Sequence, residues 1–240
     1  MKHFLKANWE QIIMANYEVP DAVLLPYLPA GVELDTFQGK SFVSLVGFKF
    51  SSTRIFNFPI PYLGTFEEIN LRFYVKKYEN GIVKRGVVFI NETVPYAVVA
   101  WVANVLYKER YVAVKTKHSW TFSEQHKHIK YCWKINQNWN HISVNAYQQS
   151  NEMQKGSFEE FIFEHYFGFT KIDDNTTEEY SIHHHRWTIN AIEEVDINCN
   201  FKDMYGSDFA FLNSLAPTAV FITNGSAIAV DWKRRRFNSN

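Results

Sequence analysis

The sequence has no excess of charge of either sign. Its 25 basic and 25 acidic residues cancel, so the formal net charge at pH 7 is +0. A chain without a global field attracts neither polyanionic nucleic acid nor an anionic membrane surface. The one basic run, residues 233–236, is short and fits a solvated end of the chain. We therefore expect no nucleic-acid partner and no membrane association.

Cysteine is nearly absent, and long apolar segments are missing. Cys132 and Cys199 are the only cysteines and form no Cys-x-x-Cys pair, so neither a disulfide framework nor a thiolate metal site is expected. Residues 1–11 lack the apolar core and cleavage site of a secretory leader, and no later run reaches the length of a membrane span. These absences predict a cytoplasmic protein with reduced cysteines.

The motifs of nucleophilic and nucleotide-dependent enzymes are also missing. The sequence contains no Gly-x-Ser-x-Gly elbow and no phosphate-binding glycine loop, and neither cysteine has a histidine beside it. Hydrolase and nucleotide-dependent functions are therefore disfavoured. We expect no cofactor.

Aromatic residues are abundant, at 17% of the chain. Rings fit the pleated, half-buried surface of a strand, so this composition favours an α+β protein that is mainly antiparallel β. The same rings either fill a core or form the wall of an internal cavity, and composition does not decide between the two.

The expected elements follow from turns, prolines and periodicity. Asn80-Gly81 and Asn224-Gly225 predict tight hairpins. Residues 95–107, which open on proline and continue as an apolar run, predict one long buried helix. A capping box at Ser157 predicts a second helix that ends near residue 166. No linker or internal repeat interrupts the chain, so residues 1–240 are expected to form a single domain.

Residues 65–75 carry the strongest chemical pattern. If they form a strand, one face holds Glu67, Ile69, Leu71, Phe73 and Val75, and the other holds Phe66, Glu68, Asn70, Arg72 and Tyr74. The second face either lies in water or forms the wall of a cavity. In a cavity, Glu68 would act as general acid or base and Arg72 would bind a carboxylate or enolate oxygen. We predict Glu68 and Arg72 as catalytic residues, and Phe66, Asn70 and Tyr74 as ligand-binding residues.

Histidines supply weaker candidates. In a strand, His183 and His185 point one way and His184 the other, and no acidic or cysteine partner stands at a ligand-like spacing, so no metal site is expected there. Packing, hydrogen bonding or cavity lining is the interpretation for these histidines. His165 closes the second predicted helix near Phe161, where interaction with the helix dipole is the alternative to an acid/base role. We keep His165 and His183 as ligand-binding candidates.

Taken in order, these segments resemble the uncharacterised family DUF2071 over nearly the whole chain. The matching pieces are residues 25–35, 66–75, 157–169, 183–187, 205–206 and 217. Their order and spacing carry the resemblance, since no single motif is decisive.

That family in turn looks like a member of the acetoacetate decarboxylase-like superfamily. The resemblance implies a mostly antiparallel β-barrel with a cone-shaped, partly apolar central cavity and a few helices outside it. In those decarboxylases an aromatic-x-Glu strand supplies a cavity carboxylate, and here Phe66-Glu67-Glu68 gives that place to Glu68.

The Schiff-base lysine of the decarboxylases has no match in this sequence. In the decarboxylases this lysine follows a proline on a strand after the central helix. Our placement of that position falls at Arg110-Tyr111, with Tyr111 where the lysine would stand. Lys115 and Lys117 lie farther along and do not match the motif. Tyr111 is therefore predicted as a hydrogen-bonding residue of the ligand site.

These observations predict a small-molecule-binding protein that acts on a small oxo or aromatic acid by acid/base chemistry without a Schiff-base lysine. Other hypotheses stay open: a non-catalytic ligand sensor, or a homo-oligomeric structural module that uses exposed strand edges. A further one is decarboxylation through a lysine imine, which an adduct on Lys115 or Lys117 after borohydride trapping with an acetoacetate-like substrate would support. A small-molecule ligand is the expected partner, and further copies of the chain are the second.

Overall fold

The computed structural model describes residues 3–108 and 110–238, without the side chains of residues 106 and 107. The strands are β1 (His3–Val19), β2 (Glu33–Leu34), β3 (Ser41–Ile55), β4 (Phe58–Pro59), β5 (Phe66–Glu79), β6 (Ile82–Val94), β7 (Tyr111–Ala113), β8 (Thr116–Phe122), β9 (His126–Ile135), β10 (Asn138–Glu152), β11 (Phe167–Lys171), β12 (Thr176–His184), β13 (Thr188–Asn198), β14 (Ala219–Asp231) and β15 (Arg235–Asn238). The helices are α1 (Asp21–Leu24), α2 (Ala97–Tyr107), α3 (Phe158–Phe163) and α4 (Phe201–Tyr205), with 3-10 helices at Leu25–Tyr27 and Ser207–Ser214. The expected class, mainly antiparallel β with few helices, is confirmed.

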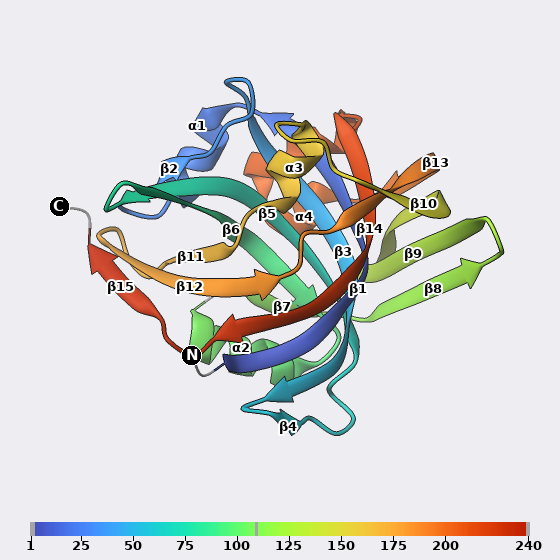
Figure 1. Cartoon of the computed structure of the whole chain (residues 1–240), viewed down its shortest axis with the longest axis horizontal. Coiled ribbons are helices and arrows are strands. Elements are labelled where there is room, and N and C mark those ends of the chain that lie inside the picture. The colour runs from blue at the N-terminus through green and yellow to red at the C-terminus, as the bar shows by residue number, and fades with distance from the viewer. Residues whose placement is uncertain (1–2, 109, 239–240) are drawn as a thin grey trace.

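Seven strands form a ring (Figure 1). Hydrogen bonding runs from β1 through β3, β5, β6, β11, β12 and β14 and returns to β1. The pairing of β12 with β14 closes the ring, from Ile182 opposite Val230 to His184 opposite Ile228. Strands β13, β10, β9 and β8 continue outward from β14 as an arm. Since each strand of the ring has a neighbour on both sides, its interior is walled all the way round by paired backbone.

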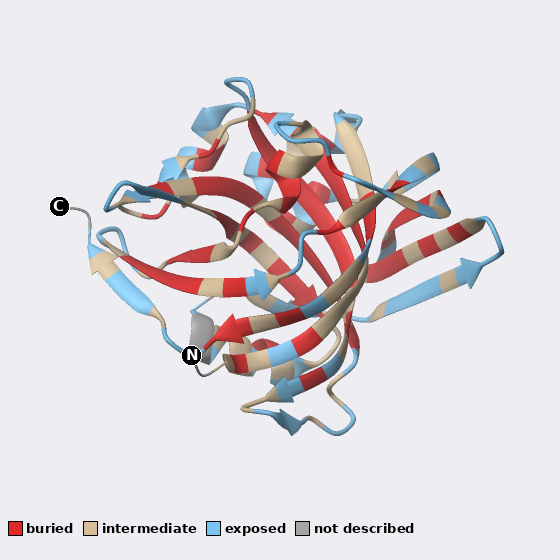
Figure 2. Cartoon of the chain, in the orientation of Figure 1, coloured by how far each residue is buried: buried red, intermediate tan, exposed pale blue. Residues whose placement is uncertain are grey.

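Strands β1, β3 and β5 are buried on both faces, as the red stretches in Figure 2 show. From β5, Ile69, Leu71 and Phe73 join a core cluster that includes residues of the arm. The other face of β5 belongs to the ring interior, where Glu68 is 3% exposed and Asn70 is 1% exposed. The predicted alternation is therefore confirmed, and the alternative of a polar face in water is wrong for this strand.

The helix predicted at residues 95–107 forms as α2, but it is not buried. Ala100 is 5% exposed, whereas Val98 is 48% and Trp101 65% exposed. The helix covers one end of the ring interior with a single face, and Trp101 and Val105, 50% exposed, are left toward solvent. At 11 residues it is the longest helix of the described chain, in which no helix reaches the length and apolarity of a membrane span.

The second predicted helix is shorter than expected. The Ser157 hydroxyl accepts a hydrogen bond from the Glu160 N–H at 3.3 Å, as a capping box requires, and α3 then runs only to Phe163. Glu164 leaves the helical conformation with φ −89° and ψ 56°. His165 consequently follows the helix and is not part of its last turn.

The hairpin predicted at Asn224-Gly225 is wrong. Strand β14 runs through this dipeptide without turning, and Gly225 lies opposite Glu10 of β1. The two strands keep their register at this point, and a Cβ on Gly225, which has φ +80°, would stand 1.9 Å from the Trp9 carbonyl oxygen. The glycine is required for this close approach, which its sequence neighbours do not reveal.

Substituting Gly225 tests the approach of β1 to β14. Gly225 and Gly81 have similar φ values, +80° and +76°, but nothing lies within 4 Å of a Cβ on Gly81. Gly81→Ala should cost roughly 1 kcal/mol from backbone strain alone. Gly225→Ala should cost roughly 1–3 kcal/mol more because the backbones must separate. Urea unfolding of both variants measures the difference, and equal destabilisation would contradict this account of the fold.

Candidate functional site

The interior of the ring holds a cavity of about 240 Å³. Side chains of β1, β3, β5, β6, β12 and β14 line its wall, with Tyr111 of β7 and one face of α2 at an end. Most of the lining is apolar, as in small-molecule sites generally. The volume lies below the roughly 300–1,000 Å³ of drug-sized pockets, so it fits a molecule of few heavy atoms.

The strand β5 brings its polar side chains into this cavity. Glu68, Asn70 and Arg72 line it together with Phe66, whose ring stacks on Phe50 of β3 at 4.8 Å between centroids. These residues stand two positions apart on a strand, so they share a face by geometry. The sequence-predicted residues Phe66, Glu68, Asn70, Arg72 and Tyr111 are thus assembled around one space.

Asn70 and Tyr111 are both hydrogen-bonded to the Glu68 carboxylate. The Asn70 side-chain amide donates to Glu68 Oε1 at 3.0 Å, and the Tyr111 hydroxyl donates to Oε2 at 3.5 Å. The Asn70 carbonyl oxygen is buried without a hydrogen-bond partner among the described residues. A buried polar atom of this kind favours a ligand that supplies a donor. The group therefore combines a proton-accepting carboxylate with open hydrogen-bonding capacity.

Glu92 is a second cavity carboxylate, which sequence reasoning missed. It is 2% exposed and lies on β6 opposite Asn70. The hairpin register, in which Glu79 opposes Ile82, would place Asn91 opposite Asn70, but a one-residue shift gives that place to Glu92. Because side chains alternate, the shift turns the glutamate inward. The sequence around Glu92, from Asn91 to Pro95, fits an end of the strand as well as a bulge, so it does not reveal the shift.

Arg72 is the only cation among the described residues that line the cavity. One guanidinium nitrogen, Nη2, lies 3.4 Å from Met14 Sδ, and the Tyr74 ring lies 5.8 Å from Cζ. Its Nε is buried without a hydrogen-bond partner in the described chain. A guanidinium with such weak partners in an apolar wall is poorly compensated, and a carboxylate ligand would satisfy it.

Tyr74 and His165 lie beside the cavity and not among its lining residues. Their rings are 4.7 Å apart, the Tyr74 hydroxyl is hydrogen-bonded to Ser44 at 2.5 Å, and His165 Nε2 is 3.2 Å from Asp35. Burial lowers the pKa of His165 to about 4, although the bond to Asp35 opposes this shift. A neutral imidazole enclosed by rings suits packing and support of the β5 wall.

His183 also lies outside the cavity. It stands near the end of β12 with a side chain 49% exposed, and it contacts Asp231. The lysines considered in the sequence are outside as well, with Lys117 placed over the ring of Trp139. No lysine occurs among the described lining residues.

Comparison with known proteins gives a family for the chain. The model of DUF2071, described as an uncharacterized conserved protein, matches residues 6–227. A curated relative, the uncharacterized protein YqjF of Bacillus subtilis (strain 168), is 26% identical over 200 residues, which span 81% of this chain and 78% of the relative. The resemblance noted in the sequence is confirmed.

Solved structures give the same fold at low sequence identity. An acetoacetate decarboxylase-like enzyme from Sphingomonas wittichii RW1 superimposes with a TM-score of 0.66 at 10% identity, over 100% of this chain and 95% of that one. Acetoacetate decarboxylase from Legionella pneumophila gives 0.63 at 9% identity, over 98% and 87%. The enduracididine biosynthesis enzyme MppR, complexed with pyruvate, gives 0.62 at 12% identity, over 98% and 91%.

The low pKa of His165 predicts acid sensitivity. The unfolded chain protonates this histidine near pH 6.5 and the folded chain only near pH 4, so the unfolded state binds more protons between these values. Stability should be full above pH 6.5 and should fall by on the order of 3 kcal/mol as the pH drops to 4. Burial gives His184 a similarly low pKa, about 4, which adds to the slope.

Urea unfolding at pH 7 and pH 4.5 measures this slope. His165→Gln should flatten it, while His185→Gln, at an exposed position, should leave it unchanged. Identical slopes for wild type and His165→Gln would contradict the assignment.

Proposed function

The chain belongs to the DUF2071 family and has the acetoacetate decarboxylase-like fold, and from that premise we propose that it binds a small oxo or aromatic acid in the ring cavity and moves a proton on it. Arg72 holds the carboxylate of the ligand. Glu68 is the general acid or base, and Asn70 and Tyr111 orient the reacting part. This acid/base chemistry requires no Schiff-base lysine.

The observation that carries the proposal is that the Arg72 guanidinium lies in the cavity wall with only weak partners. Its charge lies in an apolar wall beside the Met14 sulfur and the Tyr74 ring, and its Nε has no hydrogen-bond partner in the described chain. A bidentate carboxylate is the group that best matches a guanidinium by geometry and charge. An anionic ligand would therefore gain more here than a neutral ligand of the same size.

The position of Glu68 supports the proton-transfer step. On β5, Cα atoms four residues apart are roughly 13 Å apart, so a ligand anchored on Arg72 extends along the strand toward Glu68. Between them stands Asn70, with a buried oxygen open to a donor. Glu92 lies across the ladder from Asn70 and gives the cavity a second carboxylate. A carboxylate close to the carbon next to the ketone of an oxo acid can take a proton from that carbon, with a hydroxyl such as that of Tyr111 polarising the carbonyl.

The solved relatives agree with this class of ligand. MppR, which shares the fold, is complexed with pyruvate, a three-carbon oxo acid. At 12% identity that likeness supports the fold alone, so the oxo-acid ligand rests on the Arg72 and Glu68 geometry of this chain.

The cellular setting forms part of the proposal. Balanced charge argues against a nucleic-acid partner, and two free cysteines, Cys132 and Cys199, suit a reducing cytoplasm. All strands of the described chain share one sheet, which supports a single domain over residues 1–240. Exposed apolar side chains on α2, including Trp101, favour assembly with further copies of the chain.

Ligand binding depends on Arg72. Pyruvate and small aromatic acids should raise the melting temperature of the wild type, and Arg72→Met should abolish this rise by removing the anion partner. Arg54→Met, which alters an exposed position on β3, is the matched control. This variant should keep the ligand-induced rise in melting temperature. Thermal shift with each acid and its neutral amide measures the effect. Equal stabilisation of wild type and Arg72→Met would refute the anchor.

Proton transfer depends on Glu68. In deuterated water the wild type should exchange the protons on the carbon next to the ketone of a bound oxo acid, which are the methyl protons of pyruvate. Glu68→Gln should slow this exchange by about 10²–10⁴-fold without loss of binding. The control variant Glu67→Gln, which is altered on the opposite face of β5, should exchange these protons at the wild-type rate. Proton NMR of pyruvate against an enzyme-free blank follows the reaction. Binding without exchange in the wild type would favour the ligand-sensor alternative over an enzyme.

A further inference from the structure

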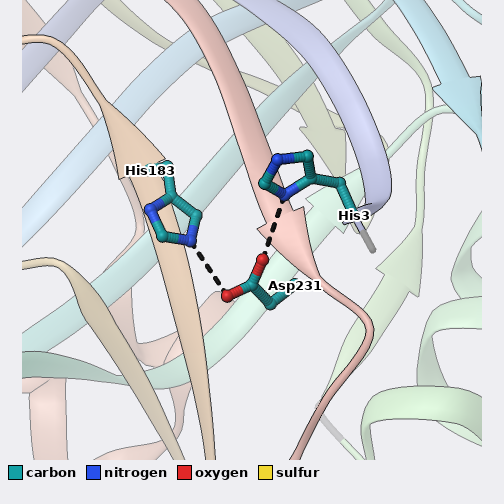
Figure 3. Close-up of side chains that lie close together, drawn as sticks. All are labelled: His3, His183 and Asp231. Atoms are coloured by element: carbon teal, nitrogen blue, oxygen red, sulfur yellow. Dashed lines mark hydrogen bonds and ion pairs between the residues drawn. The ribbon is translucent and has the colours of Figure 1, made fainter. Parts of the chain in front are cut away.

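Three potential metal ligands meet where the ends of three ring strands lie side by side. Asp231 ends β14, between His3 at the start of β1 and His183 near the end of β12 (Figure 3). They stand 228 and 48 residues from Asp231 in sequence, so no local spacing reveals them. Closure of the ring brings them together.

A β-bulge determines which residue of β1 faces Asp231. Leu5 lies opposite Val230, so a regular ladder would place Phe4 opposite Asp231, but the register shifts and His3 takes that position. The bulge thus turns His3 to the same face as Asp231. Bulges that re-aim a side chain are common next to functional sites.

On the other side, β12 needs no irregularity. His183 lies opposite Ala229, which is two residues before Asp231 and therefore shares its face. None of the three residues lines the ring cavity. The cluster is thus separate from the proposed acid site.

The three side chains already point at one another. His3 Nδ1 lies 3.0 Å from Asp231 Oδ1, and His183 Nε2 lies 3.0 Å from Oδ2. The two imidazole rings meet edge to face with centroids 5.6 Å apart. One nitrogen from each histidine and one carboxylate oxygen all lie within 4.8 Å of one another.

We propose that His3, His183 and Asp231 bind a divalent transition-metal ion of the zinc class. Two imidazoles and one carboxylate are a donor set that such ions prefer, whereas Mg²⁺ and Ca²⁺ require more oxygens. Ligand atoms around tetrahedral zinc stand roughly 3.4 Å apart. Reaching that spacing from the present distances requires the two partly exposed imidazoles to rotate.

The surroundings suit a site with open coordination positions. The Asp231 side chain is 5% exposed, whereas those of His3 and His183 are 32% and 49% exposed. The Asp231 carboxylate is therefore held inside the protein, whereas solvent reaches the two imidazoles. Three protein ligands with a free position are the arrangement of reactive zinc sites, in which water or a substrate completes the shell.

The Asp231 carboxylate is hydrogen-bonded to one nitrogen of each histidine. A bound ion would replace both hydrogen bonds with coordinate bonds and tie the first strand to β12 and β14. Metal binding should therefore stabilise the folded chain.

Zinc titration of the chelator-treated full chain tests the site. Calorimetry should show one saturable site, and the melting temperature should rise with Zn²⁺. His183→Ala should weaken affinity by more than the roughly 10–100-fold that loss of a supporting hydrogen bond to a ligand costs. The matched control is His141→Ala, which removes a single imidazole 2.8 Å from Asp196 on neighbouring strands.

The proposal is overturned if wild type and His183→Ala bind zinc equally, if His141→Ala loses as much affinity, or if no saturable site appears. His3→Ala, at a partly exposed position, gives a second test beside His183→Ala and should also weaken zinc binding. Visible spectra of bound Co²⁺ should show tetrahedral bands that both histidine variants lose. Pyruvate binding by His183→Ala is expected to be unchanged, so failure here leaves the proposed function standing.

Discussion

The structure depends on strands that are buried on both faces while their side chains alternate. In β1, β3 and β5 one set of side chains packs toward the arm and the other fills the ring. An apolar core on one side therefore fixes which residues enter the cavity on the other. Glu68, Asn70 and Arg72 are held inside because Ile69 and Leu71 cannot leave the core without exposing apolar surface.

This burial makes the charges in the cavity consequential. Water would screen Glu68 and Arg72 on an open face, whereas the apolar wall strengthens each interaction and penalises any charge that lacks a partner. The same enclosure keeps His165 neutral beside Asp35 at the end of the β5 wall. Outside the ring, Asp231 is equally buried but has two histidines as partners. The molecule thus has an apolar cavity with a buried carboxylate and a guanidinium inside the ring, and a polar cluster at the strand ends.

Much of the fold followed from local patterns. The strand at Phe66 and its hairpin at Asn80-Gly81 form as predicted, because alternation and turn chemistry are encoded within a few residues. The predictions fail where contacts between distant segments determine the local structure. Helix α2 is half exposed since no layer packs outside it, and Gly225 serves a close approach to Trp9 instead of a turn. Helix α3 ends early because the chain turns off to place His165 against Asp35.

By itself the sequence determined the mainly β class, the family, and the face of β5 that carries Glu68, Asn70 and Arg72, since alternation along a strand is a property of the chain alone. Tertiary structure decided that this face is enclosed, that Glu92 joins it, and that His3 meets His183 at Asp231. The last two depend on single-residue bulges in β6 and β1. A bulge reverses which side chains face inward, and it is set by the fit between paired strands, so no one strand's sequence contains it.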